Sequence, residues 1–258
     1  MVKFRQVNKL INMEKNPLII DSQIGIFFKD SIKRPDELIS IINGELDGVF
    51  DQMPIILPVP PDINFIDVPI VTLNSSNGEY TCTIAQSRLD FYIKGIGKQG
   101  FSDIKTNFLE KSNKILNKIK KDHKLKRLAF INRFFIKEDK DSEVISELIV
   151  KKFKRLQGET NIYSTTVQYS TRETFNDIVF NNFTLIQPSI TTIKNLFNHV
   201  KGVLITRDFN TIPENDYSET LSKDVLGSIM DWSESKFNID KILEIIWPIK
   251  VTQVTQGQ

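Results

Sequence analysis

The residues best placed for chemistry are Asn132 and Arg133, which interrupt an apolar stretch at 127–137. A strand alternates its faces, so the amide and the guanidinium must point to opposite sides of a sheet. A buried guanidinium without a partner is strongly unfavourable, which leaves two interpretations for Arg133. Either it pairs with a carboxylate on a neighbouring strand, with Asp90 and Glu173 as the candidates, or it binds an anionic ligand.

General acid–base chemistry at neutral pH has few candidates in this chain. His123 lies in a lysine-rich stretch and His199 precedes a predicted strand, so both are expected at the surface. No Gly-x-Ser-x-Gly turn occurs, and the single cysteine, Cys82, can form neither an internal disulfide nor a multi-thiolate zinc site. Because no constellation supplies a nucleophile, a base and an electrophile together, the sequence favours a non-enzymatic protein without metal or cofactor.

Two loops carry weaker signals for phosphate or metal binding. Residues 95–100 place three glycines between a strand and a helix, where N–H groups could bind an anion. Their spacing fits no nucleotide-binding fingerprint, so a connector is the simpler interpretation. Glu138-Asp139-Lys140 follows a predicted strand and, with Asp90, would suit a Mg²⁺-dependent nuclease. The alternative is an ordinary charged turn.

The charge of the chain is uneven. Residues 105–127 carry nine Lys or Arg against two acidic residues, a net of 9 − 2 = +7, and residues 208–244 carry a net of 3 − 9 = −6. The two regions could face each other or solvent. A basic stripe along the predicted helix could instead bind nucleic-acid phosphates or an acidic partner. The candidate contacts are Lys111, Lys114, Lys118, Lys121, Lys124 and Arg127.

Length and composition indicate a globular protein. The 258 residues are 40% hydrophobic and 26% charged, as in chains that bury their own core. The formal net charge of +2 does not by itself indicate a polyanionic partner. With no apolar leader and no apolar run of roughly 18 residues, we expect a cytoplasmic protein without membrane contact.

Hydrophobic periodicity predicts the same order of elements twice. The first half has a strand, a helix, three strands and a helix, at 18–29, 34–46, 68–74, 79–86, 88–94 and 102–121, with Ser102 as the N-cap of the last helix. The proline-rich stretch 54–69 is expected to be an edge or a connector. The second half repeats this order at 127–137, 142–156, 164–170, 177–187, 201–209 and 219–232, followed by a short helix at 239–247.

These elements predict an α+β fold with a largely antiparallel sheet packed by helices. We expect residues 1–258 to form a single compact unit, with strands 127–137 and 201–209 at its centre. The repeated order suggests two fused β-α-β-β-β-α halves at 16–124 and 125–247, followed by a flexible tail at 248–258.

Short motifs along the chain are similar to those of one protein family. Pro17 precedes an apolar strand, Arg88-Leu89-Asp90-Phe91 lies in the middle, Ala129-Phe130-Ile131-Asn132-Arg133 forms a central strand, and Phe237-Asn238-Ile239 lies near the end. The pattern resembles a sporadically distributed family of bacterial proteins of about this length, to which no activity is assigned. The central motif of that family is Arg-Tyr-Ile-Asn-Arg-like, so its first Arg and its Tyr are absent here. The resemblance implies a bacterial or phage origin and assigns no catalytic residue.

The sequence therefore favours a non-enzymatic binding or accessory protein. Its ligand would be a protein partner, a peptide or a small molecule in a cleft where the halves meet, and a homo-oligomer is also consistent. The candidate binding residues are Arg88, Asp90, Asn132, Arg133 and Arg172. The alternative is a nucleic-acid-binding protein or a Mg²⁺-dependent nuclease in a mobile-element or phage-defence system.

Overall fold

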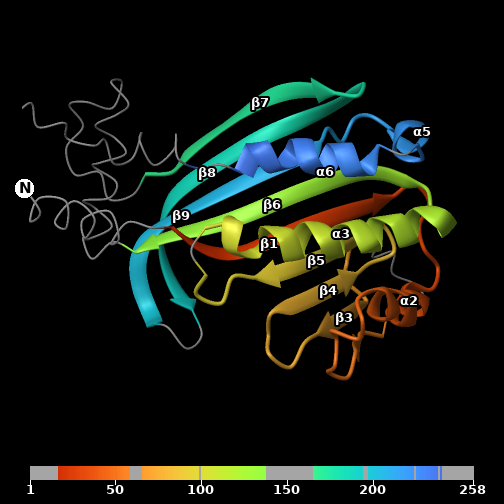
Figure 1. Ribbon diagram of the computed structural model, residues 1–258, viewed down its shortest axis with the longest axis horizontal. Helices are drawn as coiled ribbons and strands as arrows, with labels where there is room; N and C mark the ends of the chain where they lie inside the picture. Colours follow the sequence, from red (N-terminus) through yellow and green to blue (C-terminus); the bar gives the residue numbers. More distant parts are fainter. Residues whose placement is uncertain are drawn as a thin grey trace, which may run out of the picture.

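The computed structural model describes residues 17–58, 66–98, 100–137, 165–193, 197–223, 225–237 and 239. The described residues form one sheet of nine strands in the order β2-β3-β4-β5-β1-β6-β9-β8-β7 (Figure 1). Every neighbouring pair is antiparallel. The predicted α+β class and the antiparallel sheet are thus confirmed, and the sheet dominates the molecule.

The observed strands lie where strands were predicted, and most of their ends differ from the predicted ends by a few residues. They are β1 (Leu18–Phe28), β2 (Ile55–Ile56), β3 (Val71–Asn74), β4 (Tyr80–Ile84), β5 (Arg88–Lys94), β6 (Leu125–Lys137), β7 (Val167–Phe175), β8 (Ile178–Ile193) and β9 (Phe197–Thr211). The strands predicted at 127–137 and 201–209 correspond to β6 and β9, which are paired neighbours inside the sheet. In the described part of the proline-rich stretch, Ile55–Ile56 form the edge strand β2, which agrees with the prediction of an edge or a connector.

The helices are η1 (Pro35–Glu37), α2 (Leu38–Glu45), α3 (Ser102–Asp122), α5 (Ser218–Leu221), α6 (Leu226–Glu234) and η3 (Ser235–Phe237). Two predictions are wrong here. Ser102 is the first helical residue, and the N-cap is Phe101, which makes no side-chain capping bond. The closing helix predicted at 219–232 is two helices, α5 and α6. The helix predicted at 142–156, the tail at 248–258 and all of 239–247 except Ile239 lie outside the described residues.

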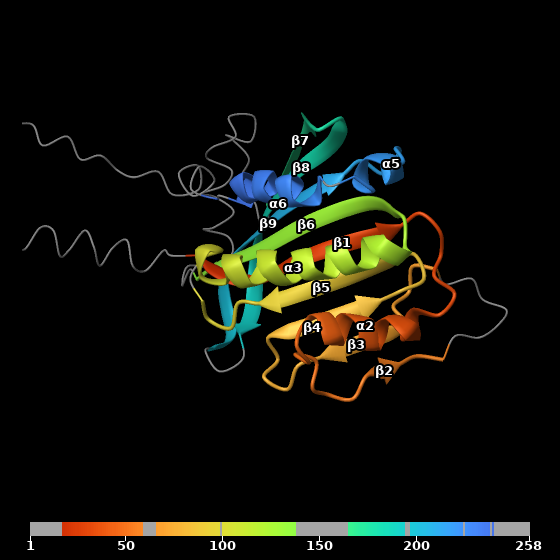
Figure 2. The same ribbon diagram turned by 45° about the vertical axis from the view of Figure 1, so that its right-hand side comes forward.

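The core lies between one face of the sheet and the helices. Figures 1 and 2 show α2, α3 and α6 on that face, with β2 and β7 at opposite ends of the sheet. The apolar stripe predicted for α3 is buried there: Ile104, Phe108, Ile115 and Ile119 are each at most 1% exposed. From the sheet side, Ile24, Phe91 and Phe130 are fully buried. Alternation along each strand sends the intervening residues to the other face.

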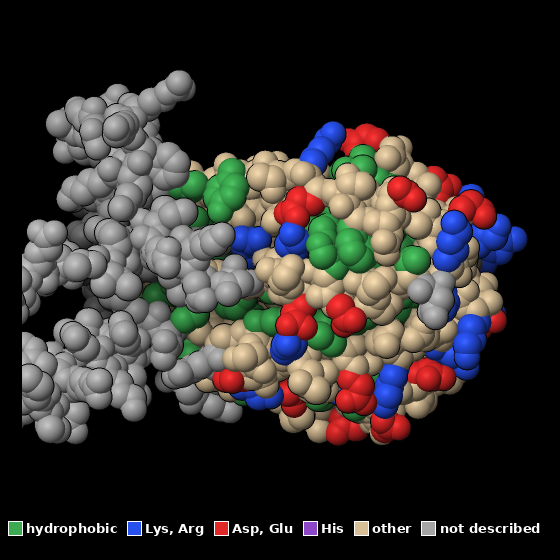
Figure 3. Space-filling view, turned by 45° about the horizontal axis from the view of Figure 1, so that its top comes forward, with side chains coloured by type: hydrophobic (Ala, Val, Ile, Leu, Met, Phe, Trp, Pro, Cys, Tyr) green, Lys and Arg blue, Asp and Glu red, His purple; other side chains and the backbone are tan. Residues whose placement is uncertain are grey.

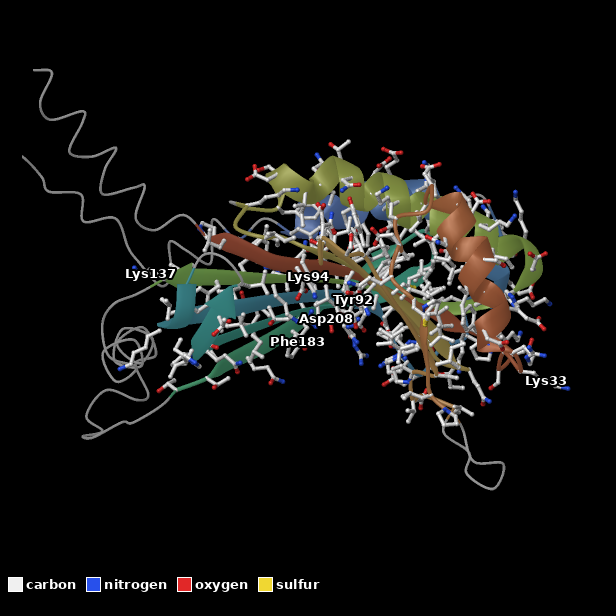
Figure 4. All side chains as sticks on the ribbon, turned by 90° about the horizontal axis from the view of Figure 1, so that it is seen from below. Lys33, Tyr92, Lys94, Lys137, Phe183 and Asp208 are labelled. Carbon is white, nitrogen blue, oxygen red and sulfur yellow. The ribbon has the colours of Figure 1, made fainter. Side chains whose placement is uncertain are left out.

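No helix of the described residues covers that other face. In Figure 4 the helices lie on one side of the sheet and the labelled side chains of Tyr92, Asp208 and Phe183 lie on the opposite side. We call this side the open face; it carries Asp21 and Arg133, which are directly opposite each other in the β1–β6 register. An antiparallel sheet with one core face permits charged side chains on its other face.

The glycine-rich stretch at 95–100 is a structural connector. Its backbone pairs with the start of β1 through Ile19 N–H to Lys98 O at 3.2 Å and Gly100 N–H to Pro17 O at 2.9 Å. A Cβ on Gly95 would overlap the carbonyl oxygen of Ile19, so only glycine allows this approach. The geometry agrees with the connector interpretation.

Candidate functional site

Three central strands bring charged residues together on the open face. Arg88 and Asp90 lie on β5, Asp21 and Gln23 on β1, and Arg133 on β6. The order β5-β1-β6 makes these strands direct neighbours, and the register aligns their open-face residues in adjacent rows. We call these five residues the open-face network.

The network is a continuous chain of polar contacts. Arg133 Nη1 donates to Asp21 Oδ1 at 2.6 Å, and Arg133 Nη2 donates to Gln23 Oε1 at 3.1 Å. Gln23 Nε2 in turn donates to Asp90 Oδ1 at 2.9 Å. Arg88 Nε lies 3.0 Å from Asp90 Oδ2 and forms an ion pair with it. This contact does not meet the geometry of a hydrogen bond, and Arg88 Nε has no hydrogen-bond partner among the described residues. Each side chain thereby holds the next in place.

Burial dominates the electrostatics of the acidic members. It raises the pKa of Asp21 and of Asp90 above 3.8, even though Arg133 and Arg88 act in the opposite direction. Burial also raises the pKa of Asp208 on β9, which accepts a 2.8 Å hydrogen bond from Asn210, and that of Tyr92 on β5. These groups are poorly solvated. A ligand that donates hydrogen bonds to them would supply the interactions that water does not provide there.

The structure separates the five predicted binding residues. It brings Arg88, Asp90 and Arg133 together. Arg133 does pair with a carboxylate, one of its two interpretations, but the partner is Asp21 and neither of the candidates Asp90 and Glu173. The β1–β6 register places Asp21 directly opposite Arg133. Glu173 is on the other face, where it pairs with Lys236.

Asn132 and Arg172 lie apart from the network. Asn132 is fully buried on the helix side, where Ser22 Oγ donates to its Oδ1, so it does not contribute to the open face. Its Nδ2 has no hydrogen-bond partner among the described residues. Arg172 is exposed on β7, with β9 and β8 between it and β6.

Sequence reasoning missed Asp21, Gln23, Tyr92 and Asp208. Alternation along 88–94 predicts a wet face for Tyr92 but no role, and Asp21 and Gln23 sit in a stretch that is typical of a mostly buried strand. A signal was present, because Asp21 and Gln23 lie two residues apart in a largely apolar strand and must share a face.

The six predicted nucleic-acid contacts do not share one surface. Lys114 Nζ lies 3.4 Å from Asp47 Oδ2, and Lys118 Nζ lies 3.4 Å from Glu45 Oε1, so α3 is paired with acidic groups in or beside α2. Arg127 is on β6, and its guanidinium lies over the Phe27 ring on the open face, away from α3. On the face shown in Figure 3, basic and acidic side chains alternate rather than gather by sign.

The basic and acidic regions of the chain meet at a specific ion pair. Lys105 on α3 pairs with Glu234 on α6. Of the two alternatives, facing each other and facing solvent, this contact agrees with the first. Elsewhere the basic residues of α3 pair with the acidic residues near α2 described above.

The remaining candidates for chemistry are not assembled into a site. His123 packs against Phe28 with ring centroids 5.7 Å apart and lines an open pocket of about 390 Å³. His199 is exposed, and the Cys82 thiol is buried, which raises its pKa. The described part of the chain contains no group of three metal-ligating side chains. Glu138-Asp139-Lys140 lies outside the described residues.

Within the described ranges, no helix is both long and apolar enough to cross a membrane. No protein-family model matches the chain, and no curated protein matches it in sequence.

Proposed function

We propose that this is a non-enzymatic binding protein whose open face holds a segment of a partner protein. The observation that carries the proposal is the open-face network on the face that no described helix covers. Its side chains are held in position by their neighbours, which reduces the conformational entropy lost when a ligand binds.

The chemistry of the open face favours a protein segment as the ligand. Guanidinium donors, carboxylate acceptors and an amide alternate across β5, β1 and β6 within the network. A peptide backbone offers both donors and acceptors and can satisfy such a mixture. A polyphosphate offers acceptors only, so it would leave the Asp21 and Asp90 carboxylates opposed to negative charge.

A duplication of two halves at 16–124 and 125–247 would account for the position of this site. In each half the first strand would pair with the last, giving β1 beside β5 and β6 beside β9. The halves would then join through β1 and β6, so the Arg133–Asp21 ion pair would lie at their junction. Two-fold related halves commonly place a ligand where they meet.

The test begins with affinity capture and continues with a purified partner. A captured protein is identified, purified and titrated calorimetrically against the wild type and two open-face variants, Arg133→Met and Asp208→Asn. We expect each variant to weaken binding by about tenfold or more, as for a charged group at the centre of an interface. Lys111→Met on α3 is the control and should bind as the wild type does. Equal affinity of all four proteins would refute the open face as the site.

Nucleic-acid binding along α3 is the alternative, and it makes a separate prediction. Replacement of Lys114, Lys118 and Lys121 by Glu should abolish a salt-sensitive shift of DNA or RNA if the stripe binds phosphates. The ion pairs of Lys114 and Lys118 make nucleic-acid binding less favourable, because acidic side chains already partly neutralise these two lysines. Absence of any shift by the wild type at low salt would end this alternative, and Mg²⁺-dependent cleavage of the same probes would favour the nuclease form of it.

A further inference from the structure

Two arginines flank one aromatic ring on the open face. Phe27 of β1 lies directly opposite Arg88 of β5 in one register and directly opposite Arg127 of β6 in the other. The three side chains therefore form one row across three neighbouring strands, next to the open-face network. Arg88 belongs to both groups.

Arg127 is held in a fixed orientation without a carboxylate partner among the described residues. Its guanidinium carbon lies 4.7 Å from the centre of the Phe27 ring, and its Nε donates to Thr211 O at 3.2 Å. No described residue accepts from its Nη1 or Nη2, and Asp208 and Glu214 act on its charge from beyond ion-pair distance. A half-buried cation with two unused donor groups is a ready partner for an oxyanion.

Arg88 presents a second set of donors beside it. Its Nε forms an ion pair with Asp90, and no described residue accepts from its Nη atoms. The Arg88 side chain is 38% exposed, so those donors are accessible. Two guanidinium groups on either side of one ring can together hold a carboxylate or a phosphate.

We propose that Arg88 and Arg127 bind the carboxylate of an acidic side chain in the partner segment. This deepens the proposed function and rests on it. A carboxylate fits better than a run of phosphates, because Asp90 and Asp208 carry negative charge on the same face and would repel neighbouring phosphates. Asp90 already neutralises part of the Arg88 charge and Asp208 part of the Arg127 charge, so the two arginines can hold one oxyanion but not a run of them.

The experiment uses fluorescent octapeptide mixtures that differ at one position. One mixture has Glu fixed at the centre, the other has Gln there, and binding to the full chain is followed by fluorescence anisotropy at low salt. We expect the wild type to bind the Glu mixture more tightly. Arg88→Met and Arg127→Met should each weaken that binding by about tenfold, as expected for a charge-assisted hydrogen bond, and leave the Gln mixture unchanged. The double variant should lose less than the sum, because both residues hold one group.

Two controls make the outcome decisive. Arg172→Met removes an exposed arginine from the same sheet away from the row and should leave both mixtures unaffected, and Arg127→Lys should retain part of the Glu preference. Equal binding of Glu and Gln mixtures, or wild-type binding by the Arg88 and Arg127 variants, would overturn the carboxylate site. Tight, salt-sensitive binding of labelled oligothymidine that both variants lose would assign the row to phosphate instead and overturn it as well.

The same data separate this inference from the proposed function. If a purified partner binds and Arg133→Met weakens it while the Glu preference is absent, only the carboxylate assignment fails. If the partner binds Arg133→Met, Asp208→Asn and the wild type alike, the open face itself fails.

Discussion

The Arg133–Asp21 ion pair joins strands that are far apart in the chain, because the two residues are separated by 112 positions. Their side chains are 31% and 18% exposed, so the pair is partly shielded from water. Breaking a pair in this situation costs less than breaking a fully buried pair and more than breaking a surface pair. Its removal leaves Asp21 with a carboxylate that is poorly solvated.

Arg133→Met should destabilise the protein by about 1–3 kcal/mol, because it leaves the Asp21 charge without its partner. The double variant Arg133→Met with Asp21→Asn should recover most of that loss. Urea denaturation of the four proteins of this double-mutant cycle measures the coupling. Arg172→Met, at an exposed position, should change stability by less than about 0.5 kcal/mol. A double variant as unstable as the single one would show that the pair does not act through Asp21.

The same variant should respond to acid in a defined direction. The folded-state pKa of Asp21 is raised above 3.8, so in the window above 3.8 the native state binds more protons than the unfolded chain, and stability falls as pH rises. Arg133 lowers the pKa of Asp21, so the loss of Arg133 raises this pKa further and extends to higher pH the range in which stability depends on pH. The stability deficit of Arg133→Met should therefore shrink as the pH is lowered from about 7 to about 4. Denaturation at several pH values tests this, and a constant deficit would contradict it.

Asp216 should behave in the opposite way. It accepts from Ser218 N–H at 2.9 Å and pairs with Lys29 at 3.1 Å, and these bonds hold its pKa at about 2. The stabilisation that the ionised Asp216 supplies is complete above pH 3.8 and is lost as the pH falls toward 2. Asp216→Asn should destabilise the protein at neutral pH and flatten that acid limb. Thermal unfolding between neutral pH and a pH of about 2 measures both effects, and an unchanged acid limb would contradict the assignment.

At the scale of elements, most strands and helices of the described residues could be predicted from the sequence. Alternation and helical periodicity are local signals, and they located β5 and α3 nearly to the residue. The break between α5 and α6 was missed, because it depends on contacts rather than on periodicity. Ser222 Oγ donates to Glu219 O at 2.7 Å, a local bond that competes with helix continuation.

The candidate site could be predicted only in part for the same reason. Alternation predicted that Asn132 and Arg133 point to opposite faces, and they do. Which carboxylate meets Arg133 depends on the register between β1 and β6, and no local pattern fixes the register of strands so distant in sequence. The role of Asp21 as the partner of Arg133 is therefore visible only in the pairing of β1 with β6.

Two glycine substitutions test how closely the elements pack. A Cβ on Gly202 of β9 would overlap the Ile136 carbonyl and the Phe135 ring, and a backbone atom cannot move aside. Gly202→Ala should therefore destabilise the protein by about 3 kcal/mol or more. A Cβ on Gly44 of α2 would meet no atom within 4 Å, so Gly44→Ala should stabilise by about 0.5–1 kcal/mol. Chemical denaturation checks both signs, and a neutral Gly202→Ala would mean that β6 and β9 lie less closely together.

At the scale of the whole molecule, the described strands belong to one continuous sheet rather than to two. The buried cluster likewise runs without interruption from Leu38 of α2 to Met230 of α6. Because the central β1–β6 pair joins both sides, neither side can lose its structure without exposing the core of the other. The single compact unit expected from the sequence remains a prediction about cooperativity.

Calorimetric unfolding should show one transition, with the measured enthalpy equal to the van't Hoff enthalpy, because the sheet and its core are continuous. Arg133→Met should move that transition to lower temperature without splitting it. Two transitions, or a calorimetric enthalpy well above the van't Hoff value, would mean that the halves unfold separately.

The central position of β1 has a consequence for how the chain is made. β1 is the first described strand to leave the ribosome, yet both of its neighbours come later: β5 ends at Lys94 and β6 ends at Lys137. Until β5 is made its apolar side chains, such as Ile24 and Ile26, have no partner strand, and until β6 is made one of its edges stays unpaired, which promotes aggregation. Synthesis of more than a hundred further residues therefore separates the appearance of β1 from its completion, and chaperones that hold nascent chains should contact this strand during that interval.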